Sequence, residues 1–461
     1  MLKTRRLMAV VVIVGALLAV VVVSQGAADD GLTPEQELGE LLYFDEDLSH
    51  PDGQACASCH TPDVGFDDPD SELPVSEGIH EGRFGDRNSP MSAYAMYAPI
   101  FYYEDVEGLF IGGQFWDGRA TGEVLGDPLA DQALGPFLNP VEMANDMKQT
   151  VVRDARTSDY KELFKEVCGA PTLDDGAYVE DAYDCIADSI AAFERTELFG
   201  EFSSKYDAYL QACLAAGGTP DGCAQGTGKV AQQVGKKFFS AAEWKGFELF
   251  MNPVNDNDGK LTGQEGAMCV LCHVADWTDP GALENEVVVP EWAPDGMVPP
   301  MFTDFTYDNL GVPKNWDNPF LYQSEEFNPG GEDFIDLGLY RFLEGRPDLW
   351  PEKPADDQGW ELAGEMGKFK VMTLRNIGMT APYAHNGLFG SLEEITHFYN
   401  TRDALGVCES FDDPGFGETC WPAAEVPETV NFDELGNLGL SAKDEAALVA
   451  FMETLSDGYT E

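Results

Sequence analysis

Two short cysteine–histidine motifs constrain the fold of this chain more than any other feature of its sequence. CASCH at 56–60 and CVLCH at 269–273 each place a histidine directly after a Cys-x-x-Cys pair. This is the attachment sequence of c-type haem, in which both thiols bond to the porphyrin and the histidine ligates the iron. One such pair could also be a redox dithiol or half of a zinc site, whereas two copies followed by histidine predict two covalent haems. The expected haem-binding residues are Cys56, Cys59, His60, Cys269, Cys272 and His273.

The sequence in front of each motif is repeated as well. Residues 33–36 and 240–243 each begin with Thr or Ser and end with Gln or Glu, which is the pattern of a helix capping box. A pattern typical of an amphipathic helix follows, with a glycine six residues after each cap, at Gly39 and Gly246. Each unit is thus predicted to be a helix, a polar loop and a haem motif. We expect a mainly α, loop-rich fold with two cytochrome c-like domains, each around one covalently bound haem.

The amino-terminal segment predicts export. Basic residues at 3–6 precede an apolar run at 7–23 and small residues at 24–28, which together indicate a secretory signal peptide over residues 1–28. The mature chain should therefore be periplasmic or extracellular. The 17 apolar residues are also near the minimum for a membrane span, so the chain would be membrane-anchored if this segment is not cleaved.

A Gly-rich polar stretch at 217–235 indicates the domain boundary. We expect an N-terminal domain at 29–237 and a C-terminal domain at 238–461. The stretch 280–350 is rich in Pro, Asp and aromatic residues and is interpreted as irregular loop, with a sheet-rich insert as the alternative. An acidic loop at 255–259 only partly resembles a calcium-binding loop, because its first ligand position is a valine, and a solvated loop is favoured.

The other cysteines and the charge indicate the conditions in which the chain works. Six further cysteines fall into close pairs, and export would place them where thiols oxidise, so disulfides are expected in preference to free buried thiols. The expected disulfides are Cys168–Cys185, Cys213–Cys223 and Cys408–Cys420.

There are 83 acidic and 27 basic residues, and the net charge of −56 disfavours binding to nucleic acid or to an anionic membrane. It favours a basic partner, a saline medium, or both.

Longer motifs around the cysteine–histidine pairs resemble bacterial di-haem cytochrome c peroxidases and the related MauG-type enzymes. The resemblance covers about residues 33–455, and we place the chain in the MauG-like subgroup. It implies that the N-terminal domain is peroxidatic and that the C-terminal domain transfers electrons. Besides CASCH and CVLCH, the segments that carry it are GDRNSP (85–90), QFWDGRA (114–120), DQALGPFLNPVEM (131–143), KVMTLRNIGMTAPYAHNG (370–387) and SLEEITHFYN (391–400).

The resemblance also implies the remaining iron ligands. In the peroxidases a histidine eight residues before a motif asparagine caps the first iron, and His80 stands in that relation to Asn88. An exposed loop histidine is the alternative. In MauG-type members a tyrosine ligates the second iron, and Tyr399 stands at that position, 14 residues after His385, where the peroxidases carry methionine. A phenolate is a hard, anionic ligand, so this haem should have a low redox potential. His80 thus favours a peroxidase and Tyr399 a MauG-type enzyme.

Further roles are implied in the same way. Glu142 and Gln132 match the acid–base pair over the open iron, where a carboxylate moves the peroxide protons. Trp116 matches a tryptophan that relays electrons between the haems, and His385 would lie near the propionates of the second haem. A surface position is the alternative for Glu142 and Gln132, and a packing role for Trp116. The residues that match an interhaem calcium site are Asn88, Thr380 and Pro382.

We expect a di-haem c-type peroxidase that reduces hydrogen peroxide to water with electrons from a protein donor, such as a small cytochrome c or a cupredoxin. The first alternative is a MauG-type enzyme that uses peroxide-derived high-valent haems to oxidise residues of a partner protein. The second is a non-enzymatic di-haem electron carrier, and Glu142 and Gln132 argue against it. A homodimer remains open, and the sequence does not determine the donor.

Overall fold

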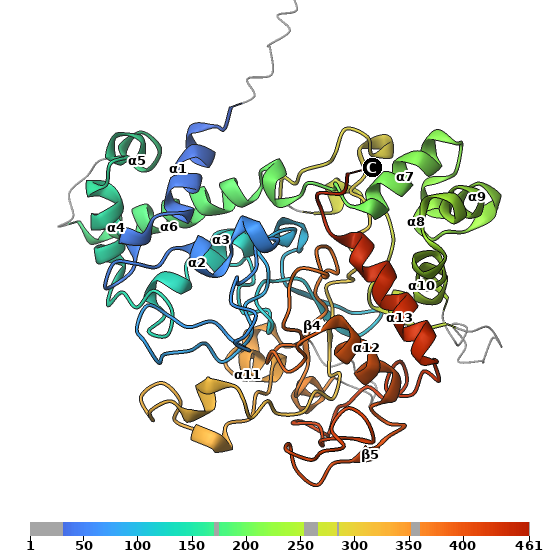
Figure 1. The fold of residues 1–461 in the computed structure, drawn as a ribbon. Coiled ribbons are helices and arrows are strands. Elements are labelled where there is room, and N and C mark those ends of the chain that lie inside the picture. Colours follow the sequence, from blue (N-terminus) through green and yellow to red (C-terminus); the bar gives the residue numbers. More distant parts are fainter. Residues whose placement is uncertain (1–30, 170–174, 253–265, 284, 352–359, 461) are drawn as a thin grey trace, which may run out of the picture.

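The computed structural model describes residues 31–169, 175–252, 266–283, 285–351 and 360–460. In this part of the chain, helices joined by long loops predominate, and the sheets are pairs of short strands (Figure 1). The prediction of a mainly α, loop-rich fold is therefore confirmed.

The helices and strands are distributed along the whole described chain. The helices are α1 (Pro34–Tyr43), α2 (Cys56–Cys59), α3 (Pro128–Ala133), α4 (Lys148–Thr157), α5 (Lys161–Cys168), α6 (Gly176–Glu194), α7 (Lys205–Ala215), α8 (Pro220–Ala224), α9 (Gly228–Phe238), α10 (Ala241–Met251), α11 (Leu339–Glu344), α12 (Leu392–Thr401) and α13 (Ala442–Met452). The antiparallel strand pairs are β1 (Tyr102–Glu104) with β2 (Leu109–Ile111) and β3 (Tyr307–Asp308) with β4 (Phe369–Lys370). The parallel pair is β5 (Gly406–Val407) with β6 (Cys420–Trp421).

Two sequence-based expectations fall outside the described residues. These are the signal peptide at 1–28 and the acidic loop at 255–259. Among the helices of the described chain, none combines the length and the apolar character needed to cross a membrane.

Helices α1 and α10 begin as their sequences predict. The Thr33 hydroxyl accepts a bond from the Gln36 amide at 3.2 Å, and the Gln36 side chain accepts one from the Thr33 amide at 3.0 Å. Ser240 and Glu243 form the same reciprocal pair at 3.2 and 2.6 Å. These bonds satisfy amide donors that a first helical turn leaves free. The predicted repeat of two capped helices is therefore confirmed.

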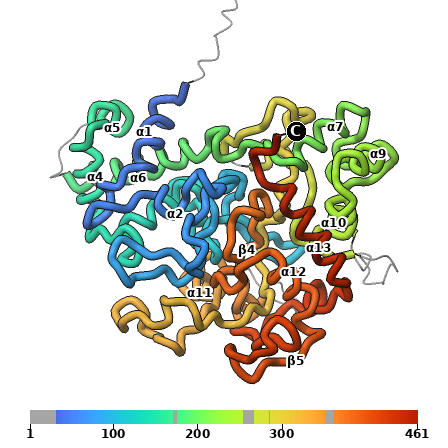
Figure 2. The backbone as a smooth tube through the Cα atoms, viewed as in Figure 1, coloured from blue at the N-terminus to red at the C-terminus, as the bar shows by residue number. Residues whose placement is uncertain are grey.

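The repeated glycine marks a close crossing of two helices in each unit. A Cβ on Gly39 in α1 would lie 1.9 Å from the Ser189 carbonyl oxygen in α6. A Cβ on Gly246 in α10 would lie 1.8 Å from the Ala447 carbonyl oxygen in α13. Both distances are far shorter than a van der Waals contact, so only a residue without Cβ lets these backbones approach. Helices α10 and α13, distant in sequence, lie side by side for this reason (Figure 2).

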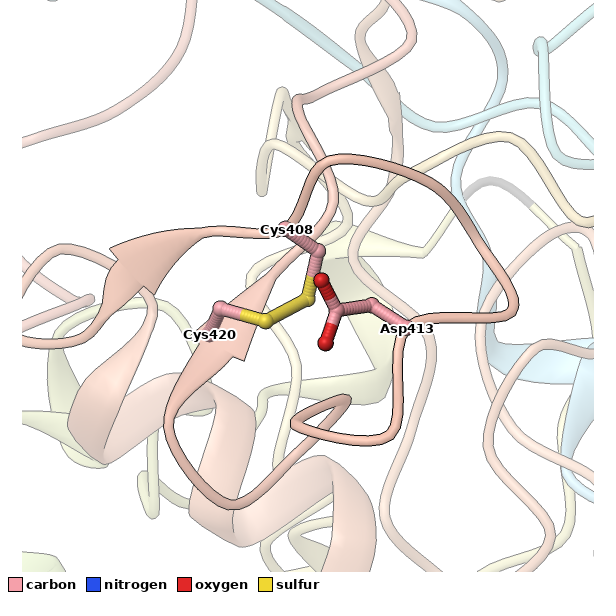
Figure 3. A group of neighbouring side chains, drawn as sticks. All are labelled: Cys408, Asp413 and Cys420. Atoms are coloured by element: carbon pink, nitrogen blue, oxygen red, sulfur yellow. A yellow bond between two sulfur atoms is a disulfide. The ribbon is translucent and has the colours of Figure 1, made fainter.

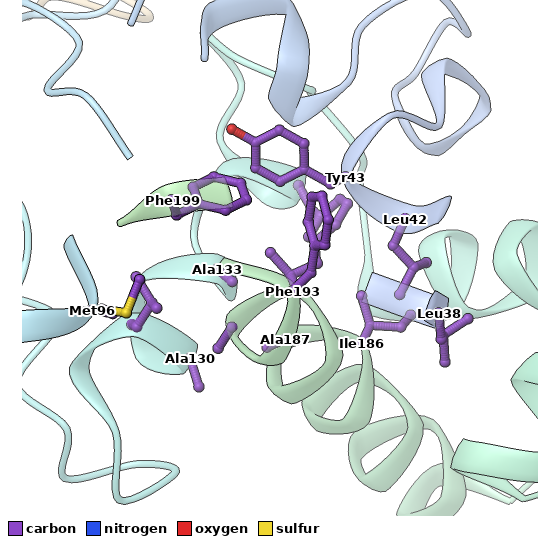
Figure 4. Close-up of a cluster of buried hydrophobic side chains, with 14 of the residues drawn as sticks. Leu38, Leu42, Tyr43, Met96, Ala130, Ala133, Ile186, Ala187, Phe193 and Phe199 are labelled. Atoms are coloured by element: carbon purple, nitrogen blue, oxygen red, sulfur yellow. The ribbon is translucent and has the colours of Figure 1, made fainter. Parts of the chain in front are cut away.

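The core of the first unit joins its helix crossing to the first haem motif. Leu42 of α1 packs with the apolar face of α6 (Figure 4). Tyr43 ends α1, and its ring meets Phe193 and Phe199 edge-on, with centroids 5.5 Å away in both cases. The Tyr43 hydroxyl donates to the His60 carbonyl oxygen at 2.9 Å. Helix α1 therefore holds the backbone of the first motif from the core side.

The core of the second unit lies among α7, α9, α10 and α13. Tyr206 and Tyr209 of α7 pack against Phe247 of α10, and Phe451 of α13 stacks on the same ring with centroids 4.9 Å apart. Helices α7 to α9 precede residue 238 in sequence but pack with the second unit. The domain ranges 29–237 and 238–461 stay a prediction.

The predicted disulfides and the predicted irregular segment are both confirmed. The three cysteine pairs are bonded as expected. Cys408–Cys420 closes the loop between β5 and β6, and Asp413 on that loop points toward the bridge (Figure 3). The described residues of 280–350 form loops and single helical turns, with the short strand β3 and the short helix α11.

A fully buried ion pair connects α7 to the segment after β4. The Arg375 guanidinium donates to Asp207 at 2.6 Å, and both side chains are 0% exposed. Arg375 also donates twice to the Pro300 carbonyl oxygen, at 2.9 and 2.7 Å, and lies over the Phe202 ring with 4.8 Å to its centroid. A buried charge is tolerable only with a partner this close, so Asp207 is a condition for the packing of this region.

Replacing Asp207 with Asn should therefore destabilise the fold strongly. Arg375 would stay buried without a counter-charge, which costs about 3–5 kcal/mol. Urea denaturation followed by far-UV circular dichroism measures the loss. Glu162→Gln is the control, because its pair with Lys165 at 2.7 Å is exposed and screened by water, so its loss should change the stability little. Equal losses in the two variants would contradict the assigned role of Asp207.

Candidate haem site

One continuous cavity is lined by both cysteine–histidine motifs. It encloses about 2920 Å³ that no atom fills, its open mouth included, and it extends from His60 to His273. Residues of both units form its wall, which includes the segments 85–95 and 369–374. The structure thus brings two motifs separated by more than two hundred residues to a shared space.

The two motifs have the same local shape. In each, the histidine amide donates to the carbonyl oxygen of the first cysteine, at 3.0 Å for His60 and 2.9 Å for His273. The four motif thiols are free, whereas the other six cysteines are in disulfides. All four thiols line the cavity, as covalent attachment of two haems requires.

Both motif histidines are prepared to ligate iron. Burial lowers the pKa of His60 and of His273 to about 4, so both rings are neutral at physiological pH. His273 Nδ1 lies 2.9 Å from the Phe302 carbonyl oxygen. Because a carbonyl only accepts, Nδ1 carries the proton and Nε2 keeps the lone pair that a metal needs. The donor set fits a c-type haem at each motif.

Glu142 and Gln132, the two residues predicted to lie over the first iron, both line the cavity. Gln132 is on α3, and Glu142 is in the turn that follows it. The Asn139 side chain donates to a Glu142 carboxylate oxygen at 2.7 Å and fixes its orientation. Burial raises the pKa of Glu142, although Arg119 and this hydrogen bond oppose the rise. The carboxyl group can therefore exchange protons nearer to neutrality than an exposed glutamate.

The two proposed distal ligands are placed differently. Tyr399 on α12 lines the cavity, and burial raises its pKa, with the second-motif cysteines adding to the rise. Its hydroxyl has no hydrogen-bond partner in the described chain. His80 is half-buried in its loop and is not part of the cavity wall. The structure brings Tyr399, but not His80, to the space where the motifs meet.

The predicted interhaem residues meet at the centre of the wall. Trp116 Nε1 donates to the Asn88 carbonyl oxygen at 2.9 Å. The Asn88 backbone amide donates to the His385 carbonyl oxygen at 2.8 Å. The His385 ring stacks on Phe369 with centroids 3.5 Å apart, and its buried Nε2 has no protein partner in the described residues. Burial lowers the pKa of His385 to about 4. The calcium candidates Asn88, Thr380 and Pro382 all line this wall.

A buried charge cluster beside these residues is absent from the sequence-based expectations. Arg87 makes 2.7 Å contacts with both Asp117 and Asp336. Arg119 approaches Asp117 at 2.9 Å. Arg87 and Asp117 lie within motifs that mark the family resemblance, but Asp336 is 249 residues from Arg87 and carries no sequence signal. The ion pairs of this cluster connect three chain segments that are distant in sequence.

Known proteins are similar to this chain over most of its length. A model of the family described as di-haem cytochrome c peroxidase matches residues 33–213. The methylamine utilization protein MauG of Paracoccus denitrificans is 33% identical over 436 residues, covering 93% of this chain and 89% of MauG. The chain belongs to the di-haem cytochrome c peroxidase and MauG family.

Other relatives and solved structures agree with this assignment. The cytochrome-c peroxidase IdrP2 of Denitromonas iodatirespirans is 24% identical, covering 91% of this chain and 81% of the relative. The diheme peroxidase BthA from Burkholderia thailandensis superposes with a TM-score of 0.64 at 25% identity, covering 93% and 87% of the two chains. A MauG-like protein associated with microbial copper homeostasis, at 22% identity, shares the fold with a TM-score of 0.53, covering 93% and 91%.

Family membership determines the class of chemistry. The family holds two c-type haems and acts on hydrogen peroxide with a protein redox partner, so this chain is an oxidoreductase of that class. The shared cavity, the four free thiols and the neutral histidines fit these cofactors. The alternative of a non-enzymatic electron carrier does not agree with this assignment.

Removing the Tyr399 hydroxyl tests its role at the second motif. In Tyr399→Phe the second ferric iron should lose an oxygen ligand, and its optical and electron paramagnetic resonance signals should change to those of an open or newly ligated haem. Tyr383→Phe is the matched control, because Tyr383 also lines the cavity but donates to the Ile377 carbonyl oxygen at 2.8 Å. An unchanged spectrum in Tyr399→Phe would exclude the hydroxyl as a ligand.

Proposed function

We propose that this chain reduces hydrogen peroxide to water at its first haem unit, with electrons from a protein partner and without prior reduction of the second haem. Each H₂O₂ takes up two electrons and two protons and yields two water molecules. The domain at 29–237 would carry the peroxide reaction and the domain at 238–461 the electron transfer. Export to the periplasm or outside the cell, and a calcium ion at Asn88, Thr380 and Pro382, belong to the same proposal.

The placement of Tyr399 is the observation that supports a reaction without prior reduction of the second haem. Tyr399 lines the shared cavity, and His80 does not. A phenolate on the second iron stabilises its oxidised state, so that haem is poorly suited to store a priming electron. If His80 does not ligate the first iron, a haem held at His60 would keep a position free for peroxide in the oxidised protein. Both effects favour peroxide binding to the fully ferric enzyme.

The residues near the first motif supply proton transfer. Bound haem iron supplies the electrons that break the O–O bond. Glu142 would take a proton from the peroxide oxygen that faces the iron and return it to the other oxygen, which leaves as water. Asn139 holds the carboxylate in place through its 2.7 Å bond, and the Gln132 amide orients the peroxide. Trp116, whose indole is fixed by Asn88, relays electrons between the units.

The partner is a protein with a basic surface. The net charge of −56 attracts such a partner over long distances, and more strongly at low salt. A small cytochrome c or a cupredoxin would donate electrons one at a time. The second candidate is a protein substrate whose own residues are oxidised, as in MauG-type enzymes. The 33% identity to MauG over 93% of the chain favours this candidate.

Mixing hydrogen peroxide with the fully ferric protein should change the haem absorption spectrum rapidly. The proposal requires a first iron with a free coordination position in the ferric protein, so peroxide can bind to it at once. Optical stopped-flow measures the rate, with the one-electron-reduced protein as the comparison. A reaction only after reduction would contradict the proposal, and it would place His80 on the first iron in the oxidised state.

Replacing Glu142 with Gln should slow the peroxide reaction by roughly 10²- to 10⁴-fold, the usual contribution of a positioned acid–base group. Glu142 must be ionised to accept a proton, and burial raises its pKa above the ordinary 4.5. The rate should therefore fall as the pH drops through this raised pKa.

In Glu142→Gln the rate should no longer fall as the pH drops through the pKa of Glu142. Glu77→Gln is the control, because Glu77 also lines the cavity but is exposed at its rim. A similar slowing in both variants, or an unchanged pH profile in Glu142→Gln, would count against Glu142 as the proton carrier.

A further inference from the structure

Lys370 is a buried lysine whose charge is not compensated within the described chain. It lies on β4, is 5% exposed and lines the cavity between the two motifs. Its Nζ donates to the Gly113 carbonyl oxygen at 2.5 Å and to Gln114 Oε1 at 3.4 Å. An ammonium group has three donors, so one remains for another acceptor.

The other cations of the cavity wall already have partners. Arg87 and Arg119 are the other lysine or arginine side chains in the described wall, and Asp117 and Asp336 pair with them. No carboxylate of the described residues lies within 4.0 Å of the Lys370 Nζ. The Phe305 ring, 5.6 Å away, offers only a weak cation–π contact. A buried ammonium group with only neutral neighbours is costly, and it calls for an anion.

The surroundings of Lys370 fix its ammonium group in place. The Gln114 side-chain amide donates to the Ala95 carbonyl oxygen at 2.6 Å, which turns Oε1 toward Nζ. The Lys370 amide donates to the Trp116 carbonyl oxygen at 2.8 Å. Burial without a counter-ion lowers the pKa of Lys370 to about 7, so the side chain holds its proton firmly only when an anion joins it. Because Lys370 lines the cavity, a group bound there can reach its Nζ.

We propose that Lys370 binds a haem propionate and is the counter-cation of that group. The haems bring the anions that the cavity wall lacks at this point, and a propionate oxygen would take the free donor of Nζ. The site lies beside Trp116, so it would also anchor one haem edge next to the proposed electron relay. This inference rests on the presence of two c-type haems and not on which partner donates electrons.

The test is the midpoint potential of each haem in Lys370→Met, measured by spectroelectrochemical titration of the intact di-haem protein. Loss of a positive charge beside a propionate stabilises the ferric state, so one haem should shift to a more negative potential. Lys370→Arg keeps the charge and should restore the potential. The spectrum of the haem that shifts identifies whether the first or the second haem supplies the propionate.

Lys368→Met is the matched control. Lys368 is two residues away, its Nζ lies 3.0 Å from Glu365, and it is not part of the cavity wall. It should leave both potentials nearly unchanged. Unchanged potentials in Lys370→Met, or an equal shift in Lys368→Met, would overturn the proposal. Haem content, measured as the pyridine haemochrome, separates this failure from a failure to hold two haems.

Two further measurements cover the case in which Lys370→Met does not fold. Lys370→Gln keeps a hydrogen-bond donor while losing the charge, and the same negative shift is expected. A crystal structure of the unaltered haem-loaded protein should show a propionate oxygen within hydrogen-bonding distance of Nζ. A protein carboxylate at that place, or no anion there, would refute the assignment.

Discussion

The architecture depends on two places where helix backbones touch. At Gly39 and Gly246 the absence of a side chain lets α1 meet α6 and lets α10 meet α13. In the first unit, Tyr43 at the end of α1 carries this contact to the His60 backbone. A methyl group at either glycine would separate the helices and shift the motif that follows. The position of the His60 backbone is therefore tied to main-chain packing.

Three cations lie in the interior of a strongly acidic chain. The whole chain has a net charge of −56, yet Arg87, Arg375 and Lys370 are concentrated in its buried centre. Two of these cations are held by aspartates from distant segments, so the charges also act as cross-links. The acidic chain attracts a basic partner, whereas Lys370, whose charge no described carboxylate compensates, suits an anionic edge of a cofactor.

Local features of the site could be predicted from sequence, and long-range ones could not. The capping boxes, the haem motifs and the disulfides each involve residues close in sequence, where geometry follows from spacing. The partnership of Arg87 with Asp336 spans 249 residues and depends on how a loop without periodicity folds back. The packing of α7 to α9 with α10 and α13 is likewise a long-range feature that sequence order does not indicate. The family resemblance indicated Tyr399, which lines the cavity, and also His80, which does not line it although residues 76–78 of its loop do.

The shared cavity has a consequence for how the protein is made. About 370 Å³ of the cavity can hold atoms the size of a water molecule, and at about 24 cal/mol per Å³ of unfilled core this space would cost roughly 9 kcal/mol if it stayed empty. That is comparable with the whole stability of an ordinary domain. Filling the cavity with both cofactors would remove this cost, so haem attachment would contribute to the stability of the fold as well as to its chemistry.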